Sequence, residues 1–364
     1  MNELEQARER INRIDAQMLA LFLERMDAVK SVSEYKIQHG LPTLDSAREA
    51  AVIEKNAMLV ADPVMRKYYI EFLQGNMAVS RHYQENLKGK MKVAFSGVFG
   101  AFAHIAAEKI YGDAEPVACN DFKSAYDSVA NGDCDVAVLP IENSTAGEIG
   151  SVLDLLFSGQ LYITGVYDLF IHQHLMAKKG TSIGEIEKVI SHPQALAQCA
   201  FYLREKGFAQ QEFDNTAAAA KYVAESDERN IAAIASEETA VLYGLEILAR
   251  NINERNMNTT RFAVVSKARA EQPEDKKRHT ILMFTVADRA GAFSEAISII
   301  GKNGYNMRCL RSRPMKELMW KYYFYAEIED NLDTEKGKAM LHELSGCCDK
   351  IRNFGSFPFP AELH

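Results

Sequence analysis

A long helical repeat at the amino end limits the folds that this chain can adopt. Apolar residues recur there at helical spacing, with charged residues between them, at Ile11, Ile14, Met18, Leu21, Phe22, Val29 and Val32. Gly40 and Pro42 end the repeat, which predicts one helix of about 36 residues and about 54 Å. Two shorter helices are predicted at about 45–59 and 63–87. Because these are too short to cover the first helix, we expect an intertwined homodimer.

Beyond Lys92 the apolar pattern changes to short buried strands separated by helical stretches, which predicts an α/β region. The strand candidates are Val93–Phe95, Val136–Leu139, Val189–Ile190, Ile231–Ile234 and Phe262–Val265. A charged segment, 267–278, is predicted to be a solvated linker. The tail has strands predicted near 279–287, 305–313, 322–329 and 350–355, in a βαββαβ, ferredoxin-like order. The predicted domains are therefore 1–88, 91–267 and 279–357.

Composition excludes several classes of protein. The net charge is -8 with no long Lys/Arg block, which argues against a nucleic-acid partner. No apolar stretch is long enough to span a membrane, and the amino end has no secretory pattern. Six cysteines without CxxC pairing are typical of free thiols in a reducing cytoplasm, so we expect a cytoplasmic protein without metal ligands.

Polar residues interrupt the helical region at spacings that place some of them on shared helix faces. They are Arg8, Arg25, Lys36, Asp45, Arg48, Glu49, Ser80 and Gln84. Arg25 and Lys36 are eleven residues apart, close to three turns, whereas Arg8 lies off their face by roughly a quarter turn. Arg8 could therefore serve a pocket of the partner subunit. Spacing alone favours solvated surface charges for the whole set.

Four polar clusters follow or precede strands of the α/β region. They are Gly97…Gly100 with His104, Pro140–Gly147, Ser191–Gln194 and Asn258–Phe262. Open α/β sheets bind ligands at such strand ends. The second cluster offers a carboxylate, an amide and two hydroxyls in Glu142, Asn143, Ser144 and Thr145. Turns and helix caps would explain each cluster singly, but together they make a cleft plausible.

The helical region resembles an all-helical chorismate mutase of the type fused to prephenate dehydratase. The resemblance rests on Arg8–Asp15, Leu23–Arg25, Lys36 and Asp45–Glu49, and more weakly on Phe72–Gln84. It implies that Arg8 crosses into the partner's pocket and that Arg25 and Arg48 hold carboxylates. Asp45, Glu49 and Ser80 would surround the hydroxyl end, and Lys36 and Gln84 would donate to the ether oxygen. Arginine suits such carboxylate clamps, and a pericyclic rearrangement needs only clamping and charge stabilisation.

The α/β region resembles prephenate dehydratase through the four clusters and Ser236-Glu237, in family order. This implies two α/β lobes, like those of a periplasmic binding protein, with the active site between them. It also makes Thr260 the residue nearest the departing hydroxyl, with Gln194 and Phe262 in the same site. Arg261 or His192 could bind the pyruvyl carboxylate. Glu142 could be the ultimate acid or could simply order its loop.

The tail resembles an ACT domain, which in this family binds phenylalanine at a subunit interface. A turn at Gly291-Ala292 opens its first helix and suits a carboxylate, and Asn306 follows. The second family motif is usually Glu-Ser-Arg-Pro, whereas this chain has Arg311-Ser312-Arg313-Pro314. A cation at Arg311 could repel the ammonium group of the ligand, or it could face away from the site.

These resemblances predict a bifunctional enzyme of phenylalanine biosynthesis. It would rearrange chorismate to prephenate and then decarboxylate and dehydrate prephenate to phenylpyruvate, under inhibition by phenylalanine and without a cofactor. Two other functions remain open: an arogenate dehydratase of the same fold, and a non-catalytic bilobal binding module with a helical dimeriser. The fused mutase favours prephenate, because a mutase would supply it.

Overall fold

A computed structural model describes the chain except for residues 1, 88, 255–257, 270–277, 316–320 and 364. The chain divides into two compact units, Met1–Met91 and Lys92–His364. The predicted linker at 267–278 falls mostly on residues outside the described ones. Among the described helices, none is long and apolar enough to cross a membrane.

The first unit consists of three helices, as the sequence predicts. They are α1 (Glu3–Gln38), α2 (Ser46–Ala57) and α3 (Pro63–Leu87), and α1 holds 36 residues. Asn2 begins α1 with a capping box shared with Glu5, and the Asp45 carboxylate caps α2 through the amide of Arg48. Each such cap stabilises its helix by about 1 kcal/mol.

Most of the apolar stripe of α1 remains exposed within a single chain. Ser33 is the one described α1 residue that is buried. The large apolar side chains of α1 that remain exposed include Leu4, Ile11, Ile14, Met18, Leu19, Leu21, Phe22, Leu23 and Val32. A monomeric protein rarely exposes an apolar surface of this extent.

The second unit begins with a lobe built on a mixed sheet of order β16-β5-β11-β3-β1-β2, with β4 paired to β3. Strands β1, β2 and β3 run parallel, and β11 runs antiparallel between β3 and β5. Its elements are β1 (Lys92–Ser96), α4 (Phe102–Ile110), β2 (Glu115–Cys119), α5 (Phe122–Asn131), β3 (Val136–Asn143), β4 (Gly147–Glu148), α6 (Gly150–Ser158), β5 (Tyr162–Phe170) and β11 (Thr259–Ser266). β16 (Ala361–Leu363) comes from the carboxyl end of the chain, beyond the predicted tail domain.

A second lobe is inserted between β5 and β11 and has its own sheet, of order β10-β6-β9-β7-β8. Its elements are β6 (His174–Ala177), a 3-10 turn (Ile183–Glu185), β7 (Lys188–Ser191), α7 (Pro193–Gln198), α8 (Ala200–Lys206), β8 (Ala209–Glu212), α9 (Thr216–Glu225), β9 (Ile231–Ala235), α10 (Glu237–Tyr243) and β10 (Glu246–Ala249). The expected arrangement of two α/β lobes is therefore confirmed.

The glycine motif after β1 joins the two lobes. Gly97 and Gly100 have φ values of 100° and 86°, which favour glycine. The carbonyl oxygen of Gly100 accepts a hydrogen bond from Thr239 Oγ1 of α10 at 2.7 Å, and Ser236 caps that helix. His104 is buried, and its Nδ1 accepts a hydrogen bond from the Gly100 amide. Burial lowers the pKa of His104 by more than the nearby Glu108 carboxylate raises it. These residues thus form a turn that contacts α10 of the second lobe, and they do not line the cleft.

The tail forms a four-stranded sheet of order β13-β14-β12-β15 with two helices. Its elements are β12 (Arg278–Phe284), α11 (Ala292–Lys302), β13 (Asn306–Pro314), β14 (Tyr322–Glu329), α12 (Glu335–Leu344) and β15 (Ile351–Pro358). The expected βαββαβ order is confirmed. Alternate residues of the sheet face opposite ways, so Leu282 and Phe284 pack with the tail helices, whereas Ile281 and Met283 share a core with the first lobe.

Candidate active sites

A cleft of about 230 Å³ lies between the two lobes of the second unit. The large apolar side chains of its lining, which suit a ring, are Phe102, Phe122, Ile149, Ile171 and Phe262. The other lining residues are Ser96, Ala101, Ala103, Pro140, Asn143, Gln173, His192, Gln194, Ala195, Gln198, Asn215, Thr216, Asn258 and Thr260. The structure therefore brings together five of the predicted residues: Asn143, His192, Gln194, Thr260 and Phe262.

Asn143 and Thr260 lie opposite each other on β3 and β11 and form the polar centre of the cleft. Asn143 Nδ2 donates to Thr260 Oγ1 at 2.9 Å and to Asn258 Oδ1 at 3.0 Å. Because the Thr260 hydroxyl accepts this bond, its own hydrogen is available to donate to a molecule in the cleft.

The orientation of the Asn143 amide is fixed by the donors around its oxygen. Oδ1 accepts the backbone amides of Thr145 at 3.0 Å and Ala146 at 2.9 Å, and it also accepts Gln194 Nε2 at 3.1 Å. Since backbone amides can only donate, the nitrogen of Asn143 must face Thr260. Gln194 belongs to α7 of the second lobe, so this bond also crosses the cleft.

Four predicted residues of this region do not line the cleft, and Thr145 is one of them. Glu142, Ser144 and Arg261 line a separate cavity of about 670 Å³ on the other face of β3 and β11. Arg261 pairs with Asp168 at 2.8 Å, and this hydrogen bond raises its pKa against the effect of burial. Glu142 pairs with Arg311 of the tail at 2.6 Å. Successive residues of a strand point to opposite faces, which is why neighbours of Asn143 and Thr260 point away from the cleft.

The cleft lining contains no Asp, Glu, Lys or Arg among the residues that the structure describes. His192 caps α7, with Nδ1 accepting the amide of Gln194 at 3.2 Å. The beginnings of α4 and α9, at Ala101–Ala103 and at Asn215-Thr216, also line the cleft. Helix amino ends attract anions through their amides and dipoles. The cleft can therefore hold an anionic molecule without a charged side chain.

In the helical unit, Arg25 of α1 reaches Ser80 of α3. The Arg25 guanidinium donates to Ser80 Oγ, and also to the carbonyl oxygen of Asn76 at 3.5 Å. Ser80 and Gln84 are buried on α3, and Gln84 Oε1 has no hydrogen-bond partner within the described part of the chain. The predicted grouping of Arg25 with Ser80 is therefore present.

The remaining predicted residues of this unit have other surroundings. Lys36 Nζ donates to the carbonyl oxygen of Thr43 at 2.7 Å. The Glu49 carboxylate forms an ion pair with the Arg81 guanidinium at 2.5 Å. Arg8, Asp45 and Arg48 are exposed. Arg8 lies seventeen residues before Arg25 on one helix, about 25 Å along its axis, and so cannot reach the Arg25 site of its own chain.

The tail has a cavity of about 900 Å³ at the start of α11. Gly291 is the N-cap of this helix, with φ 84°, and no side chain caps the helix within the described residues. Phe293, Ser312, Tyr322 and Phe324 line the same cavity. Ala292 is buried beneath the turn.

Besides Ala292, three residues predicted to contact the effector do not line that cavity. Asn306 donates to Glu329 at 2.8 Å, whereas Arg311 and Arg313 reach Glu148 of the first lobe at 3.3 and 3.1 Å. Along β13, Ser312 points to the cavity and the two arginines point to the other face. Arg311 therefore faces away from the cavity.

Comparisons with known proteins agree with this organisation. A prephenate dehydratase family model matches residues 93–270, and a chorismate mutase type II model matches residues 7–85. The bifunctional chorismate mutase/prephenate dehydratase of Aquifex aeolicus (strain VF5) is 33% identical and is matched over 98% of this chain and 98% of its own length. The chain belongs to the bifunctional chorismate mutase/prephenate dehydratase family.

Two further relatives match the second unit. Arogenate dehydratase 2 of Petunia hybrida is 33% identical, over 74% of this chain and 72% of its own length. The crystal structure of prephenate dehydratase from Arthrobacter aurescens, in complex with L-Phe, is 26% identical, with a TM-score of 0.68, and covers 75% of this chain and 93% of its own. Family membership over the whole chain means that this protein rearranges chorismate and converts prephenate to phenylpyruvate, in phenylalanine biosynthesis.

The sequence interpretation missed several polar residues of the sites. Gln173, Gln198, Asn215 and Thr216 line the cleft, and Arg81 holds Glu49 in the helical unit. Asn215-Thr216 could have been found, because a polar pair there begins α9 directly after β8. Gln173 has no comparable signal in the sequence.

Proposed function

We propose that the two reactions of this family take place in the two units separately. The cleft residues Asn143, Thr260, His192 and Gln194, with Phe262 against the ring, would carry the dehydratase reaction. Arg25, Lys36, Arg48, Glu49, Ser80 and Gln84 would carry the mutase reaction with Arg8 from a partner subunit. The observation that carries the first assignment is the Asn143–Thr260 hydrogen bond. Kinetics of variants at Thr260 test it.

In the dehydratase reaction, the ring hydroxyl and carboxylate leave together while the ring becomes aromatic. The Thr260 hydroxyl donates to the departing oxygen. The Asn143 amide donates to Thr260 Oγ1 and so fixes the orientation of that hydroxyl. A cleft without a cationic side chain in the described lining leaves the departing carboxylate poorly solvated, which favours its loss as carbon dioxide. The helix starts at Ala101 and Thr216 would hold the pyruvyl carboxylate.

In the mutase reaction, no proton or nucleophile is needed. Arg25 and Arg48 would clamp the two carboxylates of chorismate. Lys36 and Gln84 would donate to the breaking ether oxygen, Gln84 through its amide nitrogen Nε2. Gln84 is buried on α3, where solvent competes little for that donor. Asp45 and Glu49 would surround the hydroxyl end.

We propose a homodimer, or a higher oligomer, in which two copies of α1 cover each other's apolar stripe. The exposed apolar residues of α1 and the position of Arg8 support this. A cytoplasmic location is proposed because the six cysteines are free thiols.

The shared pocket leads to a prediction of complementation. Arg8→Ala and Arg25→Ala chains should each lack mutase activity, but mixing them should restore part of it. One of the two pockets in a mixed dimer then has both arginines intact. The measurement is chorismate consumption after subunit exchange, verified by mass spectrometry of differently tagged chains. If exchange occurs without any recovery, Arg8 does not act across the dimer.

We further propose that the tail is an ACT domain that binds phenylalanine at the Gly291 cavity. The start of α11 at Gly291, which has no side-chain cap among the described residues, suits a carboxylate, and Phe293, Tyr322 and Phe324 suit an aromatic ring. Inhibition then requires that phenylalanine prefer one global state of the protein.

Calorimetric titration with phenylalanine is expected to show binding in the micromolar to millimolar range, together with inhibition of prephenate turnover. Ser312→Trp, which places a bulky ring in the cavity, should weaken both effects by about tenfold or more, or about 1.4 kcal/mol. Tyrosine of equal concentration serves as the ligand control. Absence of heat and of inhibition at millimolar phenylalanine would remove the effector assignment.

A further inference from the structure

Two carboxylates face each other across the hairpin that carries Asn143. Glu142 lies opposite Glu148 in the β3–β4 register, and Asn143 lies opposite Gly147. The loop between these strands supplies the Thr145 amide that fixes Asn143. Like charges directly opposite each other on paired strands destabilise the pairing. The hairpin therefore needs a cation at this position.

Arg311 of the tail supplies that cation. Its guanidinium reaches Glu142 at 2.6 Å and Glu148 at 3.3 Å. The side chains of Arg311, Glu142 and Glu148 are 32%, 25% and 18% exposed, so solvent screens them less than it screens surface charges. Burial lowers the pKa of Arg311, but the hydrogen bond to Glu142 and both carboxylates raise it more, and the guanidinium stays charged.

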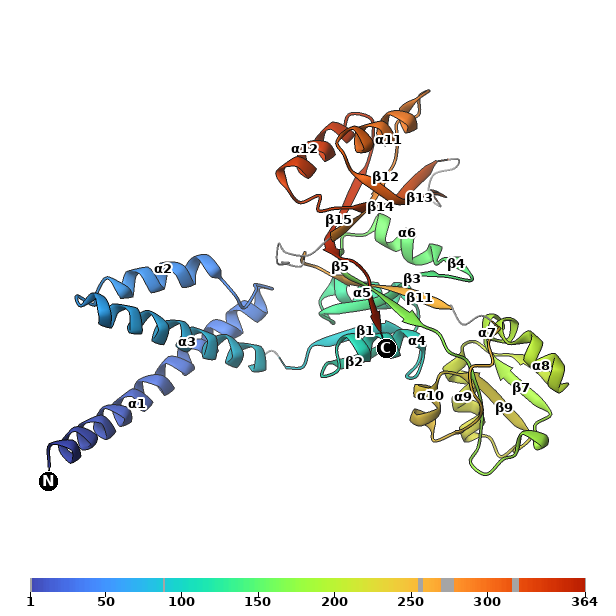
Figure 1. Ribbon diagram of the computed structural model, residues 1–364, viewed down its shortest axis with the longest axis horizontal. Helices are drawn as coiled ribbons and strands as arrows, with labels where there is room; N and C mark the ends of the chain where they lie inside the picture. The colour runs from blue at the N-terminus through green and yellow to red at the C-terminus, as the bar shows by residue number, and fades with distance from the viewer. Residues whose placement is uncertain (1, 88, 255–257, 270–277, 316–320, 364) are drawn as a thin grey trace. The chain divides into compact units, whose positions relative to one another are not determined.

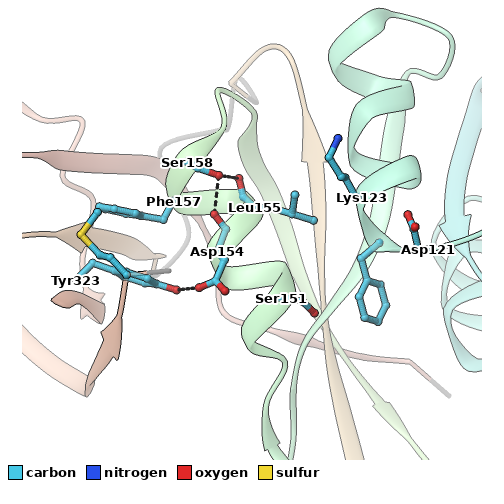
Figure 2. A pocket seen from close by; sticks show the side chains of 10 residues that line it. Asp121, Lys123, Ser151, Asp154, Leu155, Phe157, Ser158 and Tyr323 are labelled. Carbon is cyan, nitrogen blue, oxygen red and sulfur yellow. Dashed lines mark hydrogen bonds between the residues drawn. The ribbon is translucent and has the colours of Figure 1, made fainter. Parts of the chain in front are cut away.

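A second arginine and an aromatic contact hold β13 in this position. Arg313 pairs with Glu148 at 3.1 Å and donates to Tyr323 Oη at 3.0 Å. Tyr323 in turn donates to Asp154 of α6 at 2.8 Å and stacks on Phe157, with ring centroids 4.4 Å apart. Figure 2 shows the Tyr323 hydroxyl pointing to Asp154, with the Phe157 ring beside it. Arg311 is therefore fixed to the first lobe by its own strand.

We propose that Arg311 is a positioning residue for the dehydratase reaction. Its guanidinium neutralises the facing carboxylates of Glu142 and Glu148, and this holds the hairpin in the form that presents Asn143 to the cleft. Arg311 itself lies on the opposite face of the sheet and does not touch the cleft. The inference rests on the proposed role of Asn143 and Thr260.

Other charged and titratable groups surround this pair on several elements. They are Arg308, Cys309 and Arg313 on β13, His279 on β12, Tyr323 on β14, Asp154 on α6, Glu362 on β16, and Arg261 on β11 with its partners Asp168 and Glu327. Arg261 is held by two carboxylates of its own and cannot replace Arg311. Without Arg311, Glu142 would lose its paired cation, and Arg313 alone would remain to pair with Glu148 and Asp154.

Arg311→Met keeps most of the side-chain length and removes the charge. The kcat of the dehydratase should fall about tenfold with a smaller change in KM, because small shifts of a positioned group are costly. Mutase turnover should not change. Arg311→Lys should retain most of the activity. The matched control is Arg308→Met on the same strand, where the arginine pairs with Glu329 of the tail itself, and its dehydratase kinetics should equal those of the parent.

A second substitution separates positioning from a general loss of structure. Arg311→Met combined with Glu142→Gln restores the original excess of one carboxylate over arginines in the cluster, so dehydratase kcat should recover.

Parental dehydratase kinetics of Arg311→Met would overturn the inference. So would a loss that Glu142→Gln does not relieve. If Arg311→Met does not fold, the Arg311→Lys and Arg311→Met/Glu142→Gln chains still test the requirement for charge balance. If instead Thr260 and Asn143 variants keep full turnover, the cleft assignment fails, whatever Arg311 shows.

Discussion

Thr260→Val is expected to lower dehydratase kcat by about 10²–10⁴ while leaving the fold and the mutase activity intact. Valine keeps the shape of threonine and removes the hydroxyl that receives Asn143 Nδ2. The fold should lose only about 1 kcal/mol, because Asn143 Nδ2 retains Asn258 Oδ1 as an acceptor. Phenylpyruvate formation from prephenate, at saturating substrate, measures the effect.

Thr259→Val is the matched control for this change. Thr259 precedes Thr260 on β11 but lines the cavity on the other face of the sheet, so the same loss of a hydroxyl should leave turnover nearly unchanged. Thr260→Ser restores the hydroxyl and should retain a useful fraction of activity. A Thr260→Val chain with parental kinetics would make Thr260 a structural residue at the start of a strand.

Arg25→Ala is expected to lower mutase activity by about 10²–10³, with prephenate turnover unchanged. Arg25 is half-buried and donates to Ser80, so its removal takes away a proposed carboxylate clamp from the helical unit. Lys36→Ala should have a similar effect through loss of the donor to the ether oxygen. Chorismate consumption by each variant is the measurement.

Lys30→Ala serves as the control on the same helix. Lys30 is exposed on α1 and lies on a different face from Arg25. Its replacement should leave both activities near their parental values. Near-parental chorismate turnover by either Arg25→Ala or Lys36→Ala would show that the mutase pocket is elsewhere.

Much of the fold follows from periodicity alone. The expected bounds of α3 agree with the structure, and those of α2 differ by one or two residues at each end. β8, by contrast, consists of Ala-Gln-Gln-Glu and is exposed at every position, so no apolar alternation marks it. β16 joins the first lobe from the far end of the chain, and no local pattern predicts such a long-range pairing.

The candidate site could be predicted only in part. The polar clusters of the sequence indicated where the strands end, but they did not indicate the face of the sheet to which each side chain points. Asn143 faces Thr260, whereas its neighbour Glu142 faces Arg311. The pairing of β3 with β11 also shifts its register between Arg261 and Phe262, and this brings Pro140 to the same cleft as Asn143. A bulge of this kind cannot be inferred from strand alternation. The exchange of glutamate for Arg311 was visible in the sequence, but its partners were not.

We propose that one chain carries both reactions at separate sites. The most direct measurement is to supply purified chain with chorismate alone and to follow chorismate, prephenate and phenylpyruvate by their ultraviolet spectra. We predict that the parent consumes chorismate and accumulates phenylpyruvate, that Thr260→Val stops at prephenate, and that Arg25→Ala converts only added prephenate. A parent chain that leaves chorismate unchanged, or that accumulates prephenate without forming phenylpyruvate, would show that the chain does not carry both reactions.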